Sequence, residues 1–426
     1  MPKPVAMLLI ALVIVRVASV TWSATERVRG DFYASMPGAY VETLNPTLWE
    51  SPDMQGAWGY HKHTYFHGPT QYLTLYPIAL LDTFAAIAAL LLPIYAALLG
   101  VTFWLMWRIA RRLGASDALF VPLLTSTFLF FPLLQAYLQR EFEVVITCLI
   151  AGALLLLIDK RSSKAAALLA YAAWFKYIPL LFAGYLGLRR WWKALAVFGV
   201  VSAAVLILSQ WLFGLDRFFN NNVPGHAAQV FALWGYSFDY EASHHLYGMG
   251  FCEGWVDNES TLTNIRHGLC TMAAYNKWIH PPVIYLALCA AVAAVYLSAH
   301  ARLERVRPGG VIEARRRALE VSIVTTICAC FFFSHYYYLI LLVIPFNVLL
   351  IGYLVDQRYR ALAIWGVAYF LVSAFIVPIT LLSRLAGFDV WEPYVWQGWF
   401  LYGEFLLVGL LLYEYRRLAL MPSVAH

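Results

Sequence analysis

Residues 4–22 read PVAMLLIALVIVRVASVTW and form the first of a series of long apolar segments that decide the fold. Lys3 precedes this segment, and a charged run follows it from Thr25. Its length falls within the roughly 17–25 residues that a transmembrane helix needs. No small-residue cleavage site stands before the charged run. We therefore expect a retained membrane span and not a removed signal peptide.

The composition of the whole chain indicates the same class. Of its 426 residues, 62% are hydrophobic and 13% are charged, whereas about a quarter of the residues of a soluble domain are charged. We expect an all-α, polytopic membrane helical bundle in which residues 1–426 form a single integral membrane domain. The net charge of +6 does not indicate a nucleic-acid partner, because its distribution along the chain explains it.

Lys and Arg residues alternate with the apolar segments and predict the topology. Twenty of the 30 basic residues fall into clusters that we place on the cytoplasmic side, as the positive-inside rule predicts. This bias puts both termini in the cytoplasm. The clusters are Lys3; Arg108, Arg111, Arg112; Lys160, Arg161, Lys164; Arg189, Arg190, Lys193; Arg302, Arg305, Arg307, Arg315, Arg316, Arg317; Arg358, Arg360; and Arg416, Arg417.

The apolar stretch 165–188 has basic clusters at both ends and must enter the membrane and return if both clusters are cytoplasmic. Its two arms of about 11 residues are too short to cross about 30 Å of hydrocarbon. We therefore predict a re-entrant-like helix pair with its turn near 174–179, and about twelve helices in all. The other predicted spans are 4–22, 84–107, 117–134, 142–158, 194–213, 281–300, 319–333, 339–355, 362–383 and 399–415.

Two large extracytoplasmic loops are predicted, at about 24–83 and 214–280, and the connection 301–318 is the only long cytoplasmic loop. Cys252 and Cys270 share the second outer loop, so they either form a disulfide in an oxidising compartment or remain free thiols. The histidines of the outer loops, His67 among them, show no metal-ligand spacing. We predict no metal and no cofactor.

Asp31 stands at the head of the first outer loop. A carboxylate at the membrane surface can act as a general base on an acceptor hydroxyl, or it can simply cap a short helix. Lys176 lies within the predicted hairpin, where a cation is costly and therefore suggests a function. It either binds a phosphate or snorkels to the membrane surface.

Arg140 and His335 lie at two other predicted outer turns, in QREFE (residues 139–143) and SHYYY (residues 334–338). Arg140 either joins a phosphate site or pairs with Glu141 or Glu143. His335 either orients a base or binds phosphate, or it belongs to an interfacial aromatic belt.

Taken together, these segments resemble glycosyltransferase family 87 of the GT-C superfamily, the membrane transferases that use a polyprenyl-phosphate sugar. Three stretches over roughly residues 1–360 carry the resemblance. They are GDFY (30–33) with YFHGP (65–69); QREFE (139–143) with WFKYIP (174–179) and RRWW (189–192); and HYY (335–337) with LVIP (342–345). The pattern Gly-Gln-hydrophobic-Asn is commoner in the family at the position of QREFE.

The resemblance implies a GT-C helical bundle with a cavity open to the outer leaflet. It implies that Asp31 is the catalytic base and that His335 assists it or contacts phosphate. Lys176 and Arg140 would lie near the donor phosphate. The remaining substrate contacts that we predict are Gln139, Tyr336 and His67.

The predicted function is a membrane glycosyltransferase that moves a hexose or pentose, mannose favoured, from a polyprenyl-phosphate sugar to an extracytoplasmic acceptor hydroxyl with inversion. The partners are this donor, a lipid or glycan acceptor and membrane lipids, in a bacterial plasma membrane. A polytopic transporter or lipid flippase is the alternative, since the short hairpin also suits such proteins. A non-catalytic envelope scaffold is a third hypothesis.

Overall fold

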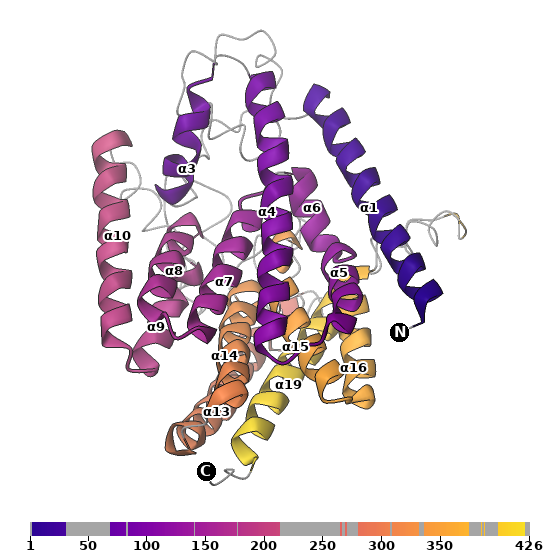
Figure 1. The fold of residues 1–426 in the computed structure, drawn as a ribbon. Helices are drawn as coiled ribbons and strands as arrows, with labels where there is room; N and C mark the ends of the chain where they lie inside the picture. Colours follow the sequence, from indigo (N-terminus) through magenta and orange to yellow (C-terminus); the bar gives the residue numbers. More distant parts are fainter. Residues whose placement is uncertain are drawn as a thin grey trace. The chain divides into compact units, whose positions relative to one another are not determined.

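The computed structural model describes residues 2–30, 69–81, 84–139, 141–176, 178–213, 265, 269–270, 280–306, 309–331, 336–374, 385, 387 and 399–421. Over these ranges the chain is helical and contains no strand, which confirms the predicted all-α class (Figure 1). The ranges hold fourteen α-helices, together with short 3₁₀ segments and one π segment.

The chain divides into two compact units. Unit 1 comprises residues 1–108, 124–129 and 133–224, and unit 2 comprises residues 109–123, 130–132 and 225–426. Helices α4 (Phe84–Arg112), α5 (Phe120–Phe128) and α6 (Phe131–Gln139) contribute residues to both. The expectation of a single membrane domain stays a prediction.

Helix α8 (Ser162–Lys176) is the centre of unit 1 and contacts α3 (Pro69–Ala79), α7 (Glu143–Ile158), α9 (Leu181–Leu188) and α10 (Trp192–Phe213). It is rich in alanine, which favours helix and lets neighbouring backbones approach closely. Its small buried side chains are Ala165, Ala166, Ala170, Ala172 and Ala173.

Helix α19 (Trp399–Leu420) has the corresponding place in unit 2. It contacts α13 (Pro281–Val306), α14 (Gly310–Cys330), α15 (Val343–Val355), α16 (Tyr359–Tyr369) and the π segment η9 (Phe370–Ala374). Gly403 is the point of closest approach, because a Cβ atom built there would lie 2.7 Å from Val372 Cγ2 and 3.1 Å from the Ala368 carbonyl oxygen. Only glycine fits at this contact without a shift of the neighbouring helix.

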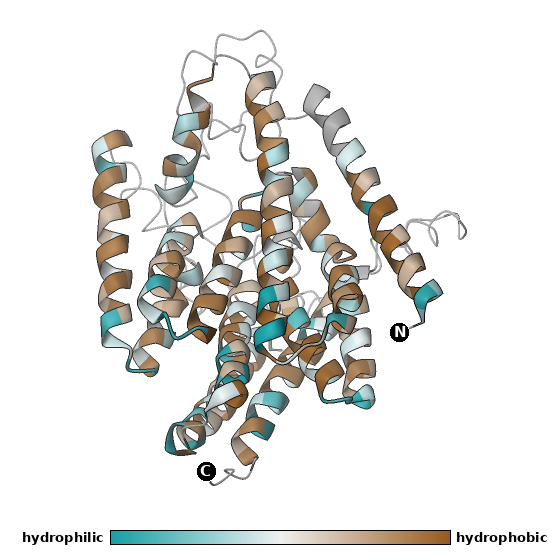
Figure 2. Cartoon of the chain, in the orientation of Figure 1, coloured by the Kyte–Doolittle hydropathy of each residue, from teal (hydrophilic) through white to brown (hydrophobic). Residues whose placement is uncertain are grey.

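Four described helical segments are long and apolar enough to cross a membrane, or five if the bent pair 117–128 and 131–138 is one span. The four are Lys3–Trp22, Ala89–Arg112, Trp192–Leu212 and Val283–Val306. Figure 2 shows, for example, that α10 is hydrophobic along most of its length, with its hydrophilic residues at the ends. The chain is a membrane protein; the count of twelve helices stays a prediction.

Several predicted boundaries were wrong. Helix α1 (Lys3–Gly30) continues about 12 Å beyond Trp22, at 1.5 Å per residue, where we expected the first outer loop to begin. Helix α14 begins at Gly310, so most of the expected loop 301–318 is helical. Its charged first turns are stabilised by pairs spaced four residues apart, Arg317 to Glu313 and Arg316 to Glu320.

The predicted hairpin 165–188 corresponds to α8, the 3₁₀ segment η7 (Ile178–Leu180) and α9. Helix α8 ends at Lys176, within the turn predicted near 174–179. Pro179 lies in η7, where its missing N–H is best tolerated. Helices α8 and α9 contact each other, as Figure 1 shows, and each contacts α10.

Three interhelical turns share one geometry, in which a residue other than glycine has a positive φ. These residues are Lys160 (61°), Arg190 (54°) and Gln357 (54°), after α7, α9 and α15. The following N–H returns to the carbonyl five residues earlier, which is the Schellman motif that ends a helix. The three bonds are Arg161 N to Leu156 O (2.8 Å), Trp191 N to Leu186 O (3.0 Å) and Arg358 N to Tyr353 O (2.8 Å).

The cysteines fall into two groups. Cys148, Cys289, Cys328 and Cys330 are free thiols within helices. Cys270 is disulfide-bonded, and Cys252 lies outside the described residues. One of the two alternatives left open by the sequence, a pair of free thiols, is therefore wrong for Cys270.

Candidate functional site

Side-chain hydrogen bonds link the start of α3 to the C-terminal part of α8. Thr70 Oγ1 donates to the Tyr171 carbonyl at 3.2 Å, and Gln71 Nε2 donates to the Phe175 carbonyl at 3.2 Å. Thr74 Oγ1 and the Tyr171 hydroxyl are 3.0 Å apart. Thr70 and Gln71 are fully buried. The Phe175 carbonyl lies in the last turn of α8, where no intrahelical N–H reaches it, so Gln71 supplies its donor.

The turn between α6 and α7 lies against the same end of α8. Phe142, in this turn, packs on Phe175 with the ring centroids 5.8 Å apart, and both rings are buried. The flanking carboxylates Glu141 and Glu143 are also buried, with 4% and 1% of their surface exposed. Both carboxylates thus flank the Phe142–Phe175 contact, and buried carboxylates are costly without cationic or hydrogen-bonded partners.

Three stretches singled out from the sequence therefore converge within unit 1. Gln139 is the last residue of α6, Arg140 follows it, and Lys176 is the last residue of α8. His67 stands two residues before α3. Arg140 and His67 lie outside the described residues, as do the side chains of Gln139 and Lys176, so the positions of the four functional groups stay predictions.

The remaining predicted residues are not brought to this junction by any described contact. Asp31 lies outside the described residues and directly follows α1. His335 also lies outside them. Tyr336 begins the 3₁₀ segment η8 (Tyr336–Leu342) of unit 2, and its side chain is not described. Their roles as base, assistant and substrate contact stay predictions.

Sequence reasoning missed two buried polar residues. Gln71 belongs to a segment that we interpreted only as the end of a loop. Glu404 lies inside the apolar segment of α19, is fully buried, and neither of its carboxyl oxygens has a hydrogen-bond partner among the described residues. A carboxylate in the interior of a predicted span was a signal for Glu404, because ionisable residues in spans are costly and tend to be functional.

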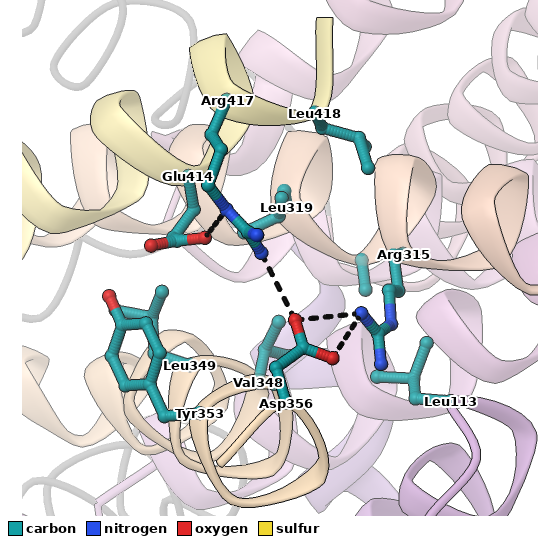
Figure 3. A pocket seen from close by; sticks show the side chains of 12 residues that line it. Leu113, Arg315, Leu319, Val348, Leu349, Tyr353, Asp356, Glu414, Arg417 and Leu418 are labelled. Atoms are coloured by element: carbon teal, nitrogen blue, oxygen red, sulfur yellow. Dashed lines mark hydrogen bonds and ion pairs between the residues drawn. The ribbon is translucent and has the colours of Figure 1, made fainter. Parts of the chain in front are cut away.

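A second polar region lies in unit 2 at the basic end of its helices, which we define by Arg315, Arg316, Arg358 and Arg417. A cavity of about 40 Å³ opens there, room for only two or three waters. Asp356 bridges two cations on its wall, with Arg315 Nη1 at 2.8 Å and Arg417 Nη2 at 3.0 Å (Figure 3).

The remaining charges at this cavity are also paired. Glu414 accepts a bond from Arg417 Nε at 2.8 Å and forms a close ion pair with Arg358. Burial alone would lower the pKa of Arg358, but its hydrogen bond to Glu414 raises that pKa above the ordinary value. Because these charges pair with one another, the ion pairs link α14, α15 and α19. The cavity therefore does not suit an ionic ligand.

A buried polar network centred on Glu320 joins α13, α14 and α19. Glu320 is fully buried and accepts bonds from Arg316 Nε at 2.9 Å and the Tyr415 hydroxyl at 2.6 Å, while His300 Nδ1 lies 3.3 Å away. Burial alone would lower the pKa of Arg316, but Glu320 and Glu304 raise it above the ordinary value. Arg316 therefore stays charged and neutralises the buried carboxylate.

Of the two polar regions, the junction in unit 1 is the one at which the segments that carry Arg140 and Lys176 meet, and their binding of a substrate anion stays a prediction. Comparison with known proteins supports a transferase. The family model of glycosyltransferase family 87 matches residues 65–331, which is more than half of the chain and includes the whole junction. No curated protein and no solved structure matches the chain. The chain is a membrane protein that belongs to glycosyltransferase family 87.

Proposed function

We propose that this glycosyltransferase moves a sugar, mannose favoured, from a polyprenyl-phosphate sugar to an acceptor hydroxyl on the extracytoplasmic side of a bacterial plasma membrane, with inversion. The observation that carries the proposal is the junction in unit 1. There the end of α8, the start of α3 and the turn 139–143 meet at the Phe142–Phe175 contact.

Lys176 and Arg140 bind the donor phosphate in this proposal. Both belong to segments that end at the junction. A phosphodiester carries one negative charge, and the phosphate gains a second as the bond to the sugar breaks. Fixed cations in a site that excludes water stabilise that developing charge strongly. Gln139 and His67, next to the same segments, are assigned to substrate contacts.

Asp31 is the general base. Its carboxylate takes the proton of the acceptor hydroxyl while the oxygen attacks the anomeric carbon from the face opposite the phosphate. The bond between that carbon and the phosphate oxygen breaks, and polyprenyl phosphate leaves with the electron pair. His335 assists the base or contacts the phosphate, and Tyr336 contacts substrate.

Two observations support the proposed side of the membrane. The clusters of Lys and Arg mark one side as cytoplasmic by the positive-inside rule, and Asp31, Arg140 and His335 lie in loops or turns on the opposite side in the predicted topology. Cys270, in the second predicted outer loop, is disulfide-bonded, which suits an oxidising compartment. Both observations support an extracytoplasmic site.

The test uses purified protein and a radiolabelled polyprenyl-phosphate mannose. We expect Asp31→Asn to keep donor affinity and to lower the transfer rate roughly 10²- to 10⁴-fold, the contribution of a positioned base. Asp117→Asn, a change at a largely exposed carboxylate of the same type, is the control. Transfer by Asp31→Asn at the parental rate would refute the role of Asp31.

We expect Lys176→Ala to weaken donor binding roughly 10- to 100-fold, the value of one charged hydrogen bond. Lys164→Ala is the matched control, because Lys164 is an exposed lysine near the opposite end of the same helix. Equal affinity in the two variants would remove Lys176 from the phosphate site. Movement of the labelled lipid across the membrane without chemical conversion would instead support the transporter or flippase alternative.

A further inference from the structure

Gln71 joins α3 to the residue that precedes Lys176. Its amide nitrogen donates to the Phe175 carbonyl at 3.2 Å across 104 residues of sequence, and the side chain is fully buried. Because the carbonyl can only accept, the nitrogen must face Phe175, and the orientation of the amide is settled. Gln71 thus caps the end of α8 at the point where the predicted phosphate-binding lysine leaves the helix.

We propose that Gln71 is a positioning residue for Lys176, a role that rests on the proposed function. The end of a helix frays when its last carbonyls lack donors, and the last turn of α8 is followed by η7 and not by further α-helix. The bond from Gln71 keeps this turn helical. It thereby holds the backbone of Lys176 in the position from which a cation meets the donor phosphate.

The oxygen of the same amide supports this role. Gln71 Oε1 is buried and has no hydrogen-bond partner among the described residues. It is an acceptor beside the end of α8, and an ammonium group is a donor of the matching kind. The hydroxyl of Thr70, by contrast, is directed at the Tyr171 carbonyl one turn earlier in α8, so the neighbouring residue offers a control of equal burial.

The experiment is a double-mutant cycle on donor affinity, with polyprenyl-phosphate mannose as the probe. Gln71→Met keeps the length of the side chain and removes both polar atoms. We expect it to raise the Kd about 5- to 15-fold, as the loss of one hydrogen bond allows. In the Lys176→Ala background the same change should have less than about a twofold effect, because Gln71 acts through the lysine.

Two further variants separate positioning from general stability. Thr70→Val removes another of the bonds between α3 and α8, and we expect a similar fall in melting temperature with donor affinity within about twofold of the parent. Gln71→Glu places a carboxylate against the Phe175 carbonyl. Donor binding by this variant should recover as the pH is lowered, since the protonated acid can donate again. The phosphodiester keeps its charge, so the parent and Gln71→Met should show no such recovery.

The inference is wrong if the increases in donor Kd caused by Gln71→Met and Lys176→Ala multiply in the double variant. It is also wrong if Thr70→Val loses as much donor affinity as Gln71→Met. If Gln71→Met does not fold, the pH series with Gln71→Glu decides, and a flat series overturns the inference. If the parent enzyme itself binds no donor, the proposed function fails and this inference falls with it. If the parent binds the donor but Gln71 and Lys176 act independently, this inference fails and the proposed function stands.

Discussion

Replacing Arg316 by methionine removes the cation from the ion pair with Glu320. The two side chains have 3% and 0% of their surface exposed, and Arg316 Nε lies 2.9 Å from the carboxylate. Methionine fills a similar volume, so the main consequence is a carboxylate that stays buried without its cation, next to Tyr415 and His300. Glu304, which pairs with the other side of Arg316, is nearly half exposed and can return to water.

The expected loss of stability follows from this difference in burial. Removing one partner of a buried ion pair costs about 3–5 kcal/mol. At roughly 2–4 °C for each kcal/mol in a cooperative unit of about 150–250 residues, the size range of unit 2, the apparent Tm should fall by about 6–20 °C. The pair of Arg111 with Asp117 is the control, because its side chains are 47% and 88% exposed and such pairs contribute about 0–1 kcal/mol.

Thermal unfolding of the purified protein in detergent, followed by tryptophan fluorescence, measures both variants. Arg316→Met should unfold well below Arg111→Met, which should match the parent within about 3 °C. Adding Glu320→Gln to Arg316→Met removes the orphan charge and keeps an acceptor for Tyr415, so most of the loss should be recovered. Equal Tm values for the two single variants, or a double variant less stable than Arg316→Met, would refute the reasoning.

Two further predictions concern the backbone of unit 2. Gly403→Ala should lower the apparent Tm, since its Cβ would lie 2.7 Å from Val372 and 3.1 Å from the Ala368 carbonyl oxygen, and overpacking costs about 1–3 kcal/mol. Gly409→Ala, on the same helix with no atom within 4 Å, should leave the Tm unchanged or raise it, and a larger loss than in Gly403→Ala would contradict the packing. Gln357→Gly should raise the Tm, because a non-glycine residue at φ 54° costs about 1 kcal/mol; a lower Tm would show that its side chain matters more than its backbone.

The composition and the long apolar segments were sufficient to predict a membrane protein built of helices, and α7, α10 and α13 begin within two residues of their predicted starts. Boundaries near charged residues were harder to predict. We ended the first helix near Trp22 and began another at 319, but α1 runs to Gly30 and α14 starts at Gly310. Hydropathy detects where lipid ends, whereas a helix can continue beyond it, as α14 does where its charged residues pair at a spacing of four.

For the candidate site, the sequence identified the residue types but not their neighbours. Lys176 stood out because a cation within an apolar hairpin is costly wherever the chain folds. Gln71 did not stand out, since an amide in a polar segment needs no explanation. Its importance depends on the Phe175 carbonyl, 104 residues away.

The sequence alone determined that this chain lies in a membrane, that it is helical and which kinds of chemical group it carries. These properties depend on local composition and periodicity. The tertiary structure decided that α3, the turn 139–143 and the end of α8 meet. That meeting depends on the contact of Phe142 with Phe175 and on the hydrogen bond from Gln71. Such contacts join residues far apart in the chain, and no periodicity records which side chains will share a buried space.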